Sequence, residues 1–96
     1  MQIEPWELAI VKQILNEQIP NLPVWAFGSR IKGTARPYSD LDLAVITEQP
    51  LTFLQQANLQ QAFSDSDLPW KVDILDWASA SEAFKKIVLA QYVVIQ

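Results

Sequence analysis

The most restrictive feature of this 96-residue sequence is a polar segment enclosed by two short apolar ones. Val24–Phe27 is apolar on both alternating faces, which is typical of a strand covered on both sides. This segment ends at Gly28, and the chain then stays polar and basic up to Ser39. Residues 41–45 alternate between leucine or valine and other side chains, which predicts a second strand. The sequence therefore predicts two strands joined by a polar connection.

The remaining segments predict a small α/β (α+β) fold that forms one domain over residues 1–96. Apolar side chains at helical spacing follow Pro5, which suits a first helical turn. We expect helices at residues 5–19, at residues 50–63 and, after a capping box of Ser79 and Glu82, at the end of the chain, and a third strand at residues 72–75. This order predicts helices packed on a small mixed three-stranded sheet.

The composition excludes several classes of chemistry. The chain has no Cys, which rules out disulfides, thiolate zinc sites and cysteine nucleophiles. It has no His either, which rules out a Ser-His-Asp triad and the usual imidazole ligands of zinc and iron. An enzyme built from these residues would therefore depend on carboxylates and a hard cation that prefers oxygen ligands.

The charge and the hydropathy pattern limit the partners and the location. Seven Lys and Arg against eleven Asp and Glu give a net charge of −4, so we do not expect direct binding of nucleic acid. No apolar run approaches the ~20 residues that cross a membrane. The first residues do not combine a basic stretch with an apolar one, as a signal peptide does. We therefore expect a cytoplasmic protein.

The first candidate site residues are Asp40 and Asp42. Side chains at i and i+2 of a strand lie on the same face, about 6.6 Å apart along the backbone. Two like charges ~4 Å apart repel by roughly 4 kcal/mol at a typical effective dielectric unless a cation lies between them. The pair therefore either faces bulk water or binds metal, and two magnesium ions ~3.5–4 Å apart suit phosphoryl and nucleotidyl displacement.

Gly28 and Ser29 are candidates for phosphate binding. A glycine directly after a buried strand lets the backbone approach a ligand, and exposed amides and a hydroxyl can donate to phosphate oxygens. Arg30, Lys32 and Arg36 could offset the charge of a triphosphate. Each feature alone is more often a turn or a solvated surface. Their joint occurrence favours a nucleotide site.

These residues resemble a known signature. Gly28-Ser29-Arg30, then Gly33, then Ser39-Asp40-Leu41-Asp42-Leu43 is similar to the motif of the polymerase-beta-type nucleotidyltransferases. The short length is similar to the minimal nucleotidyltransferase (MNT) group. The resemblance implies a nucleotidyltransferase fold, ATP as substrate, two Mg²⁺ ions and nucleotide contacts from Gly28, Ser29, Arg30 and Ser39.

The resemblance also implies three carboxylates that ligate metal: Asp40, Asp42 and one on a later strand. Asp73 is our choice for the third, because its strand position sets it opposite the apolar Val72 and Ile74. Asp76 is the alternative, although it could cap the turn before the last helix. A solvent-facing position without function also remains open for Asp73.

The implied reaction is transfer of AMP from ATP to a hydroxyl. For the MNT group, the resemblance implies a HEPN-type helical toxin as partner, inactivated by adenylylation of a tyrosine. Two alternatives are transfer to a small-molecule alcohol of the aminoglycoside type, with the helical partner completing the pocket, and a non-catalytic antitoxin that acts by occlusion. The apolar segment Tyr92–Ile95 either folds back on the sheet or forms part of the interface with the partner.

Overall fold

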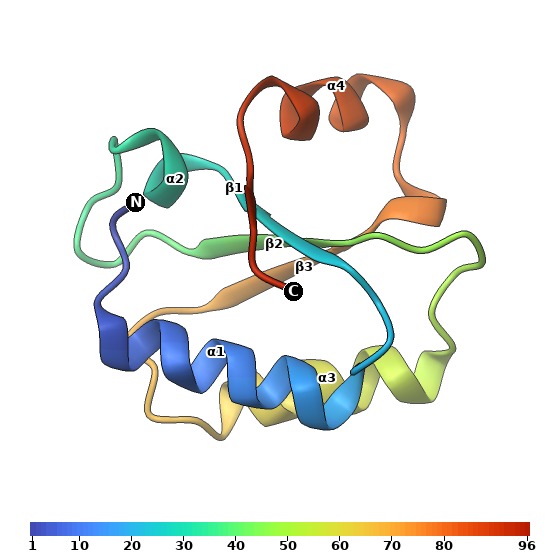
Figure 1. Ribbon diagram of the computed structural model, residues 1–96, viewed down its shortest axis with the longest axis horizontal. Coiled ribbons are helices and arrows are strands. Elements are labelled where there is room, and N and C mark those ends of the chain that lie inside the picture. The colour runs from blue at the N-terminus through green and yellow to red at the C-terminus, as the bar shows by residue number, and fades with distance from the viewer.

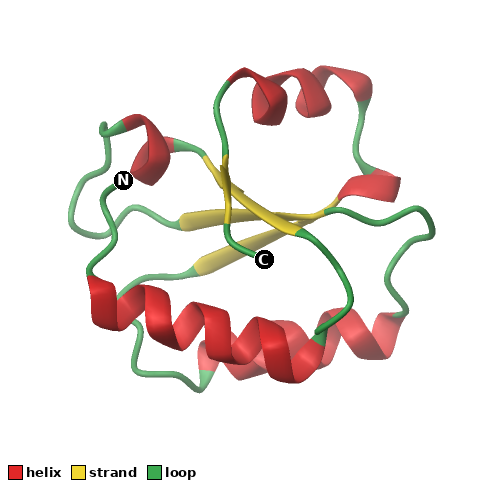
Figure 2. Ribbon diagram, in the orientation of Figure 1, coloured by secondary structure: helices red, strands yellow, loops and turns green.

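A four-stranded mixed sheet forms the centre of the molecule, with helices on both of its faces (Figure 1, Figure 2). The computed structural model describes residues 1–96. In chain order the elements are α1 (Pro5–Gln18), β1 (Val24–Phe27), α2 (Ser29–Lys32), β2 (Leu41–Val45), α3 (Phe53–Ser64), β3 (Val72–Asp76), the 3₁₀ helix η1 (Trp77–Ser79), α4 (Glu82–Ala90) and β4 (Val93–Val94). The predicted fold class is confirmed.

The strands lie in the order β3-β2-β1-β4. β1 pairs with β2 and with β4 in antiparallel fashion, whereas β2 and β3 are parallel. The three predicted strands are present, but the prediction of three strands was wrong by one, because β4 is an additional edge strand. β4 has only two residues, Val93 and Val94, both exposed, so no alternation of buried and exposed side chains marks it in the sequence.

Two helices begin later than the sequence predicts. α3 begins after Thr52 rather than at residue 50, because the Thr52 side chain and Gln55 form a capping box. α4 begins after Ser81, whose Oγ accepts a hydrogen bond from the backbone N–H of Phe84 at 3.1 Å. Ser79 instead ends η1, so the capping box predicted for it is wrong by two residues.

The main core lies between the sheet and the helices α1 and α3, which run side by side below it in Figure 1. Leu15, Leu43 and Leu59 are fully buried there. α4 covers part of the other face of the sheet through Val88. None of the helices combines the length and the apolar character that spanning a bilayer requires.

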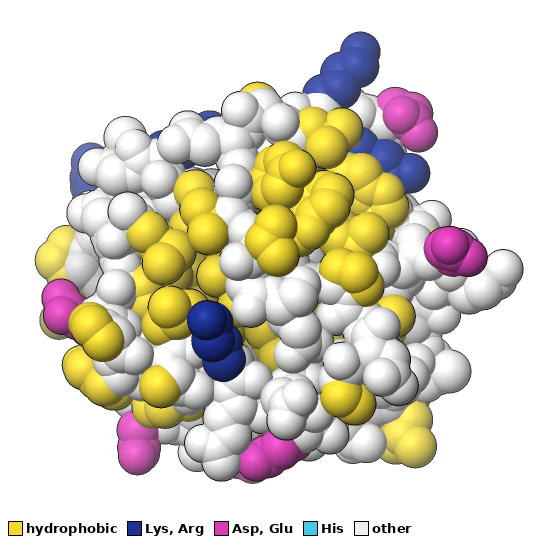
Figure 3. Space-filling view, viewed as in Figure 1, with side chains coloured by type: hydrophobic (Ala, Val, Ile, Leu, Met, Phe, Trp, Pro, Cys, Tyr) yellow, Lys and Arg dark blue, Asp and Glu magenta, His cyan; other side chains and the backbone are white.

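The C-terminal segment folds back on the sheet, which was one of the two alternatives for it. The backbone N–H of Ile95 donates to the Val24 carbonyl at 2.8 Å, and the Ile95 side chain is buried. Apolar side chains nevertheless gather at the surface around α4 and β4 (Figure 3). The exposed ones are Phe84, Ile87, Leu89, Tyr92, Val93 and Val94.

Candidate active site

The candidate residues meet at one end of the sheet, because of the directions of its strands. β1 is antiparallel to β2 and β2 is parallel to β3, so the last residue of β1 lies beside the first residues of the other two strands. Phe27 pairs with Asp42, and Asp42 pairs with Asp73. Gly28, which follows Phe27, is therefore next to Asp42.

Asp42 and Asp73 are direct neighbours across the parallel pair β2–β3. Leu43 points into the main core from β2, so strand alternation sends Asp42 to the opposite face. Val72 points into the same core from β3, which places Asp73 on the face of Asp42. Asp40 lies just before β2, two residues before Asp42, so we assign it to the same face of the sheet. Its side chain is exposed. The structure therefore brings together Asp40, Asp42 and Asp73.

Asp76, the alternative third carboxylate, lies at the far end of β3, where it pairs with Val45. Its carboxylate accepts a short hydrogen bond of 2.5 Å from the Thr47 hydroxyl. It also accepts one of 2.8 Å from the backbone N–H of Leu51. These contacts tie the β2–α3 connection to β3. Asp76 therefore has a structural role, but a different one from the cap expected before the last helix, since its side chain forms no capping hydrogen bond with η1.

The three carboxylates are not compensated by any cation of the chain. The one ion pair of the protein joins Lys85 to Glu82, away from this end of the sheet. Asp42 is half-buried, and this desolvation, followed by the charges of Asp73 and Asp40, raises its pKa from 3.8 to about 6. No group of three or more acidic side chains is arranged so that it could hold a metal ion. The site is therefore open and rich in negative charge.

Gly28 is the residue that lets the backbone come this close to Asp42. Its φ of +84° lies in a region that side chains with a Cβ rarely adopt. A Cβ at this position would lie 2.1 Å from Oδ2 of Asp42, which is far inside van der Waals contact. Ser29 follows as the first residue of α2 and is half-buried. On the β1 side, the backbone of Gly28 therefore approaches the carboxylate of Asp42 directly.

Arg30 has a role that the sequence did not suggest. Its guanidinium donates to three backbone carbonyls, those of Ser39 (2.9 Å), Gln2 (3.0 Å) and Pro37 (3.0 Å). It also lies 4.6 Å from the centre of the Trp70 ring, and only 6% of the residue is exposed. We expected Arg30 to contact the nucleotide, but its guanidinium already donates to these three backbone carbonyls inside the protein. Arg30 instead fixes the turn that leads into β2.

The other basic and polar residues of the connection are placed differently. Lys32 and Arg36 are exposed on the surface of the connection between α2 and β2. The Ser39 hydroxyl accepts a hydrogen bond of 2.9 Å from the backbone N–H of Arg36, so it closes the turn before Asp40. Contact of Ser39 with a nucleotide stays a prediction. No local sequence pattern indicates the structural role of Arg30, because one of its three hydrogen-bond partners, Gln2, is 28 positions away.

Comparison with known proteins matches residues 10–96 to the family model described as polymerase beta, nucleotidyltransferase. The chain belongs to this nucleotidyltransferase family. It is 59% identical over 96 residues to a probable protein adenylyltransferase MntA of Haemophilus influenzae. The alignment covers 100% of this chain and 84% of that protein. This nucleotidyltransferase is thus similar along its whole length to a protein described as an adenylyltransferase.

Solved structures give the same result for the fold. A toxin–antitoxin structure with AMP-PNP superposes with a TM-score of 0.78 at 30% identity, over 93% of this chain and 72% of that chain. A structure of a tri-AMPylated HEPN toxin of Shewanella oneidensis in complex with its MNT antitoxin superposes with a TM-score of 0.65 at 26% identity, over 93% and 71%. The nucleotidyltransferase fold expected from the sequence is therefore confirmed.

Proposed function

We propose that this nucleotidyltransferase transfers AMP from ATP to a tyrosine hydroxyl of a HEPN-type toxin and thereby acts as its antitoxin. The main support is the alignment of Asp42 with Asp73 on one face of the sheet, beside Asp40 and next to the backbone of Gly28. Relatives described as an adenylyltransferase and as the antitoxin of an AMPylated HEPN toxin support the choice of donor, acceptor and partner. We expect the reaction to take place in the cytoplasm.

The donor chemistry of the site suits two Mg²⁺ ions, although the carboxylates do not form a ready metal-binding cluster. Every available donor is a carboxylate oxygen, which Mg²⁺ prefers. The three carboxylates form no ion pair with a cation of the chain, and the pKa of Asp42 is raised first by burial and then by the charges of Asp73 and Asp40. Asp40 and Asp42 would hold both ions and Asp73 one of them, with the phosphate oxygens of ATP completing each shell. Bound Mg²⁺ would neutralise charge on the phosphates and acidify the acceptor hydroxyl.

The chain itself would orient the nucleotide and accept a proton. The backbone at Gly28, which lies next to Asp42, and the hydroxyl of Ser29 would bind the β- and γ-phosphates. The acceptor oxygen forms a bond to the α-phosphorus, the bond from that atom to the bridging oxygen breaks, and pyrophosphate leaves. The proton of the hydroxyl passes to the carboxylate of Asp73, which is exposed and next to Asp42.

The experiment is transfer of label from α-³²P-ATP in the presence of Mg²⁺ and the HEPN-type protein encoded beside this chain. We expect label on that protein and a loss of at least 1,000-fold for Asp42→Asn, since this variant lacks the negative charge of a proposed metal ligand. Glu48→Gln is the matched control, because Glu48 is exposed and follows the opposite end of β2, away from the carboxylates. It should retain the parental rate.

Three results would contradict the proposal in different ways. Label that appears only on added aminoglycoside-type alcohols would show that the acceptor is a small molecule. An Asp42→Asn variant that still protects cells from the toxin would show that binding alone neutralises it. Transfer by Asp42→Asn at the parental rate would mean that the site itself is misassigned.

A further inference from the structure

Of the three carboxylates, Asp40 is the one whose position the sheet does not fix. The parallel pairing of β2 with β3 begins at Leu41. Asp42 and Asp73 therefore lie inside the ladder, whereas Asp40 lies just outside it. The Asp40 side chain is also exposed, so packing does not hold it either. Its position depends on the backbone of the turn that leads into β2.

Both peptide groups that flank Asp40 are held by hydrogen bonds. Nε of Arg30 donates to the carbonyl of Ser39, which belongs to the peptide group before Asp40, at 2.9 Å. The backbone N–H of Leu41, in the peptide group after Asp40, donates to the carbonyl of Lys71 at 2.9 Å. The second bond is part of the sheet, but the first comes from a buried side chain. Arg30 thus supplies the restraint that the sheet lacks on this side of Asp40.

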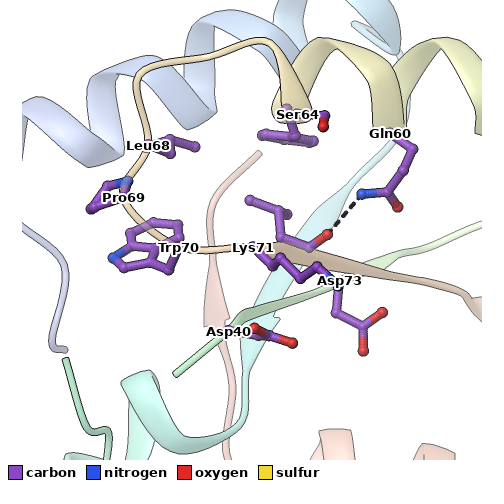
Figure 4. A pocket seen from close by; sticks show the side chains of 10 residues that line it. Asp40, Gln60, Ser64, Leu68, Pro69, Trp70, Lys71 and Asp73 are labelled. Carbon is purple, nitrogen blue, oxygen red and sulfur yellow. Dashed lines mark hydrogen bonds between the residues drawn. The ribbon is translucent and has the colours of Figure 1, made fainter. Parts of the chain in front are cut away.

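The ring of Trp70 holds the guanidinium of Arg30 in place. The guanidinium carbon lies 4.6 Å from the ring centre, which is the distance of a cation–π contact, and both residues are buried. Trp70 lies three residues before Asp73, on the segment that leads into β3. Figure 4 shows this ring together with the carboxylates of Asp40 and Asp73. Arg30 therefore connects the segment that enters β2 with the segment that enters β3.

The hydrogen bonds of Arg30 leave the charge of the carboxylates available. All three of its acceptors are neutral backbone carbonyls, and it forms no ion pair. An ion pair with Asp40 would also have fixed that carboxylate, but it would have offset the negative charge that attracts a metal ion. Arg30 can therefore fix the backbone at Asp40 without competing with a cation for its side chain.

We propose that Arg30 is a positioning residue that holds Asp40 where its carboxylate can share a metal ion with Asp42. It acts through the Ser39 carbonyl and the Trp70 ring and touches neither the nucleotide nor the ions. The inference rests on the proposed function and adds this residue to it. Lysine cannot replace Arg30, because a single ammonium lacks the planar fork that serves several carbonyls and lies flat on a ring.

The test separates metal binding from overall stability. The Kd of Mn²⁺ in the presence of AMP-PNP is measured by the enhancement of water proton relaxation, which distinguishes ions on the protein from ions on free nucleotide. We expect Arg30→Lys to raise this Kd at least tenfold at a temperature at which circular dichroism shows the variant to be folded. Val11→Ala is the control, because it destabilises the fold by removing fully buried atoms of α1, on the opposite face of the sheet from Asp42. It should leave the Kd within twofold of the parental value.

Trp70→Leu provides a second measurement with Arg30 intact. This variant keeps an apolar side chain in the core but removes the aromatic face beside the guanidinium. We expect it to raise the Kd of Mn²⁺ about threefold. If Arg30→Lys does not fold, Trp70→Leu decides, and an unchanged Kd in this variant overturns the proposal.

The outcomes separate this inference from the proposed function. An unchanged Kd in Arg30→Lys, alongside Mn²⁺ binding that is lost in Asp42→Asn, overturns the positioning role alone. An equal rise of the Kd in Val11→Ala also overturns it, because metal binding would then follow overall stability. Absence of Mn²⁺ binding in the parental chain, or full binding in Asp42→Asn, overturns the proposed function together with the positioning role.

Discussion

The two faces of the sheet differ in what they are built for, although the same strands form both. The face toward α1 and α3 belongs to a cluster of 14 buried apolar residues, whereas the face toward α4 holds a cluster of only three. On β2, Leu41 and Leu43 point to the first face and Asp42 to the second. The large core therefore supplies the stability, and the other face can tolerate three uncompensated carboxylates.

The largest expected effect on stability tests this division directly. Leu43→Ala removes a fully buried side chain from the main core and should lower the free energy of unfolding by about 3 kcal/mol. Leu75→Ala on the face of α4 should cost about 1 kcal/mol, since Leu75 is only partly buried. Urea unfolding followed by circular dichroism measures both. Equal losses would show that the two faces contribute alike.

The two glycines with positive φ allow a matched comparison at the site. Gly33 (φ +82°, ψ +18°) is left-handed helical, where alanine costs about 1 kcal/mol, whereas Gly28 (φ +84°, ψ −162°) lies in a region that essentially only glycine adopts, at a cost of roughly 1–3 kcal/mol. Only the Cβ at Gly28 collides with Asp42, while Gly33 has nothing within 4 Å. We expect transfer of AMP to fall about 100-fold in Gly28→Ala and less than threefold in Gly33→Ala. Similar losses of activity would contradict the role given to Gly28.

Arg30 and Arg36 provide the next comparison, between a buried and an exposed arginine of one connection. Arg30→Lys replaces a planar fork by a single ammonium that cannot serve three carbonyls, so we expect a loss of about 2 kcal/mol in unfolding free energy. Arg36→Lys should change it by less than 0.5 kcal/mol, as is usual at exposed positions. Thermal or urea unfolding of both variants and of the parental protein measures these changes in unfolding free energy. No difference between the two variants would remove the structural role of Arg30.

The sequence was sufficient where local pattern determines structure. Strand alternation placed Asp73 on the face of Asp42 and left Asp76 to another role, and the helix and strand order gave the fold class. The rest depends on contacts between distant residues. β4 exists because its backbone pairs with β1 some seventy residues earlier, and Arg30 is fixed by Gln2 near the N-terminus. Such pairings leave no periodic signal in the sequence.

The burial of Asp42, followed by its proximity to Asp73 and Asp40, also implies a dependence of stability on pH in the metal-free protein. The pKa of Asp42 is raised in the folded state from 3.8 to about 6, so folding favours the neutral acid. The stabilisation is complete below about pH 3.8 and is lost as the pH rises through about 6.

Asp42→Asn is always neutral, so it should be more stable than the parental protein at pH 7.5 by on the order of 1 kcal/mol, after a discount for the partial exposure of the group. The advantage should shrink toward zero at pH 4.5, where Asp42 is protonated in the parental fold. Urea unfolding of both proteins in a chelating buffer at the two pH values measures it. A difference that does not vary with pH would mean that the charge of Asp42 is already balanced in the fold. The active face would then carry no electrostatic cost, and its contrast with the opposite face would rest on packing alone.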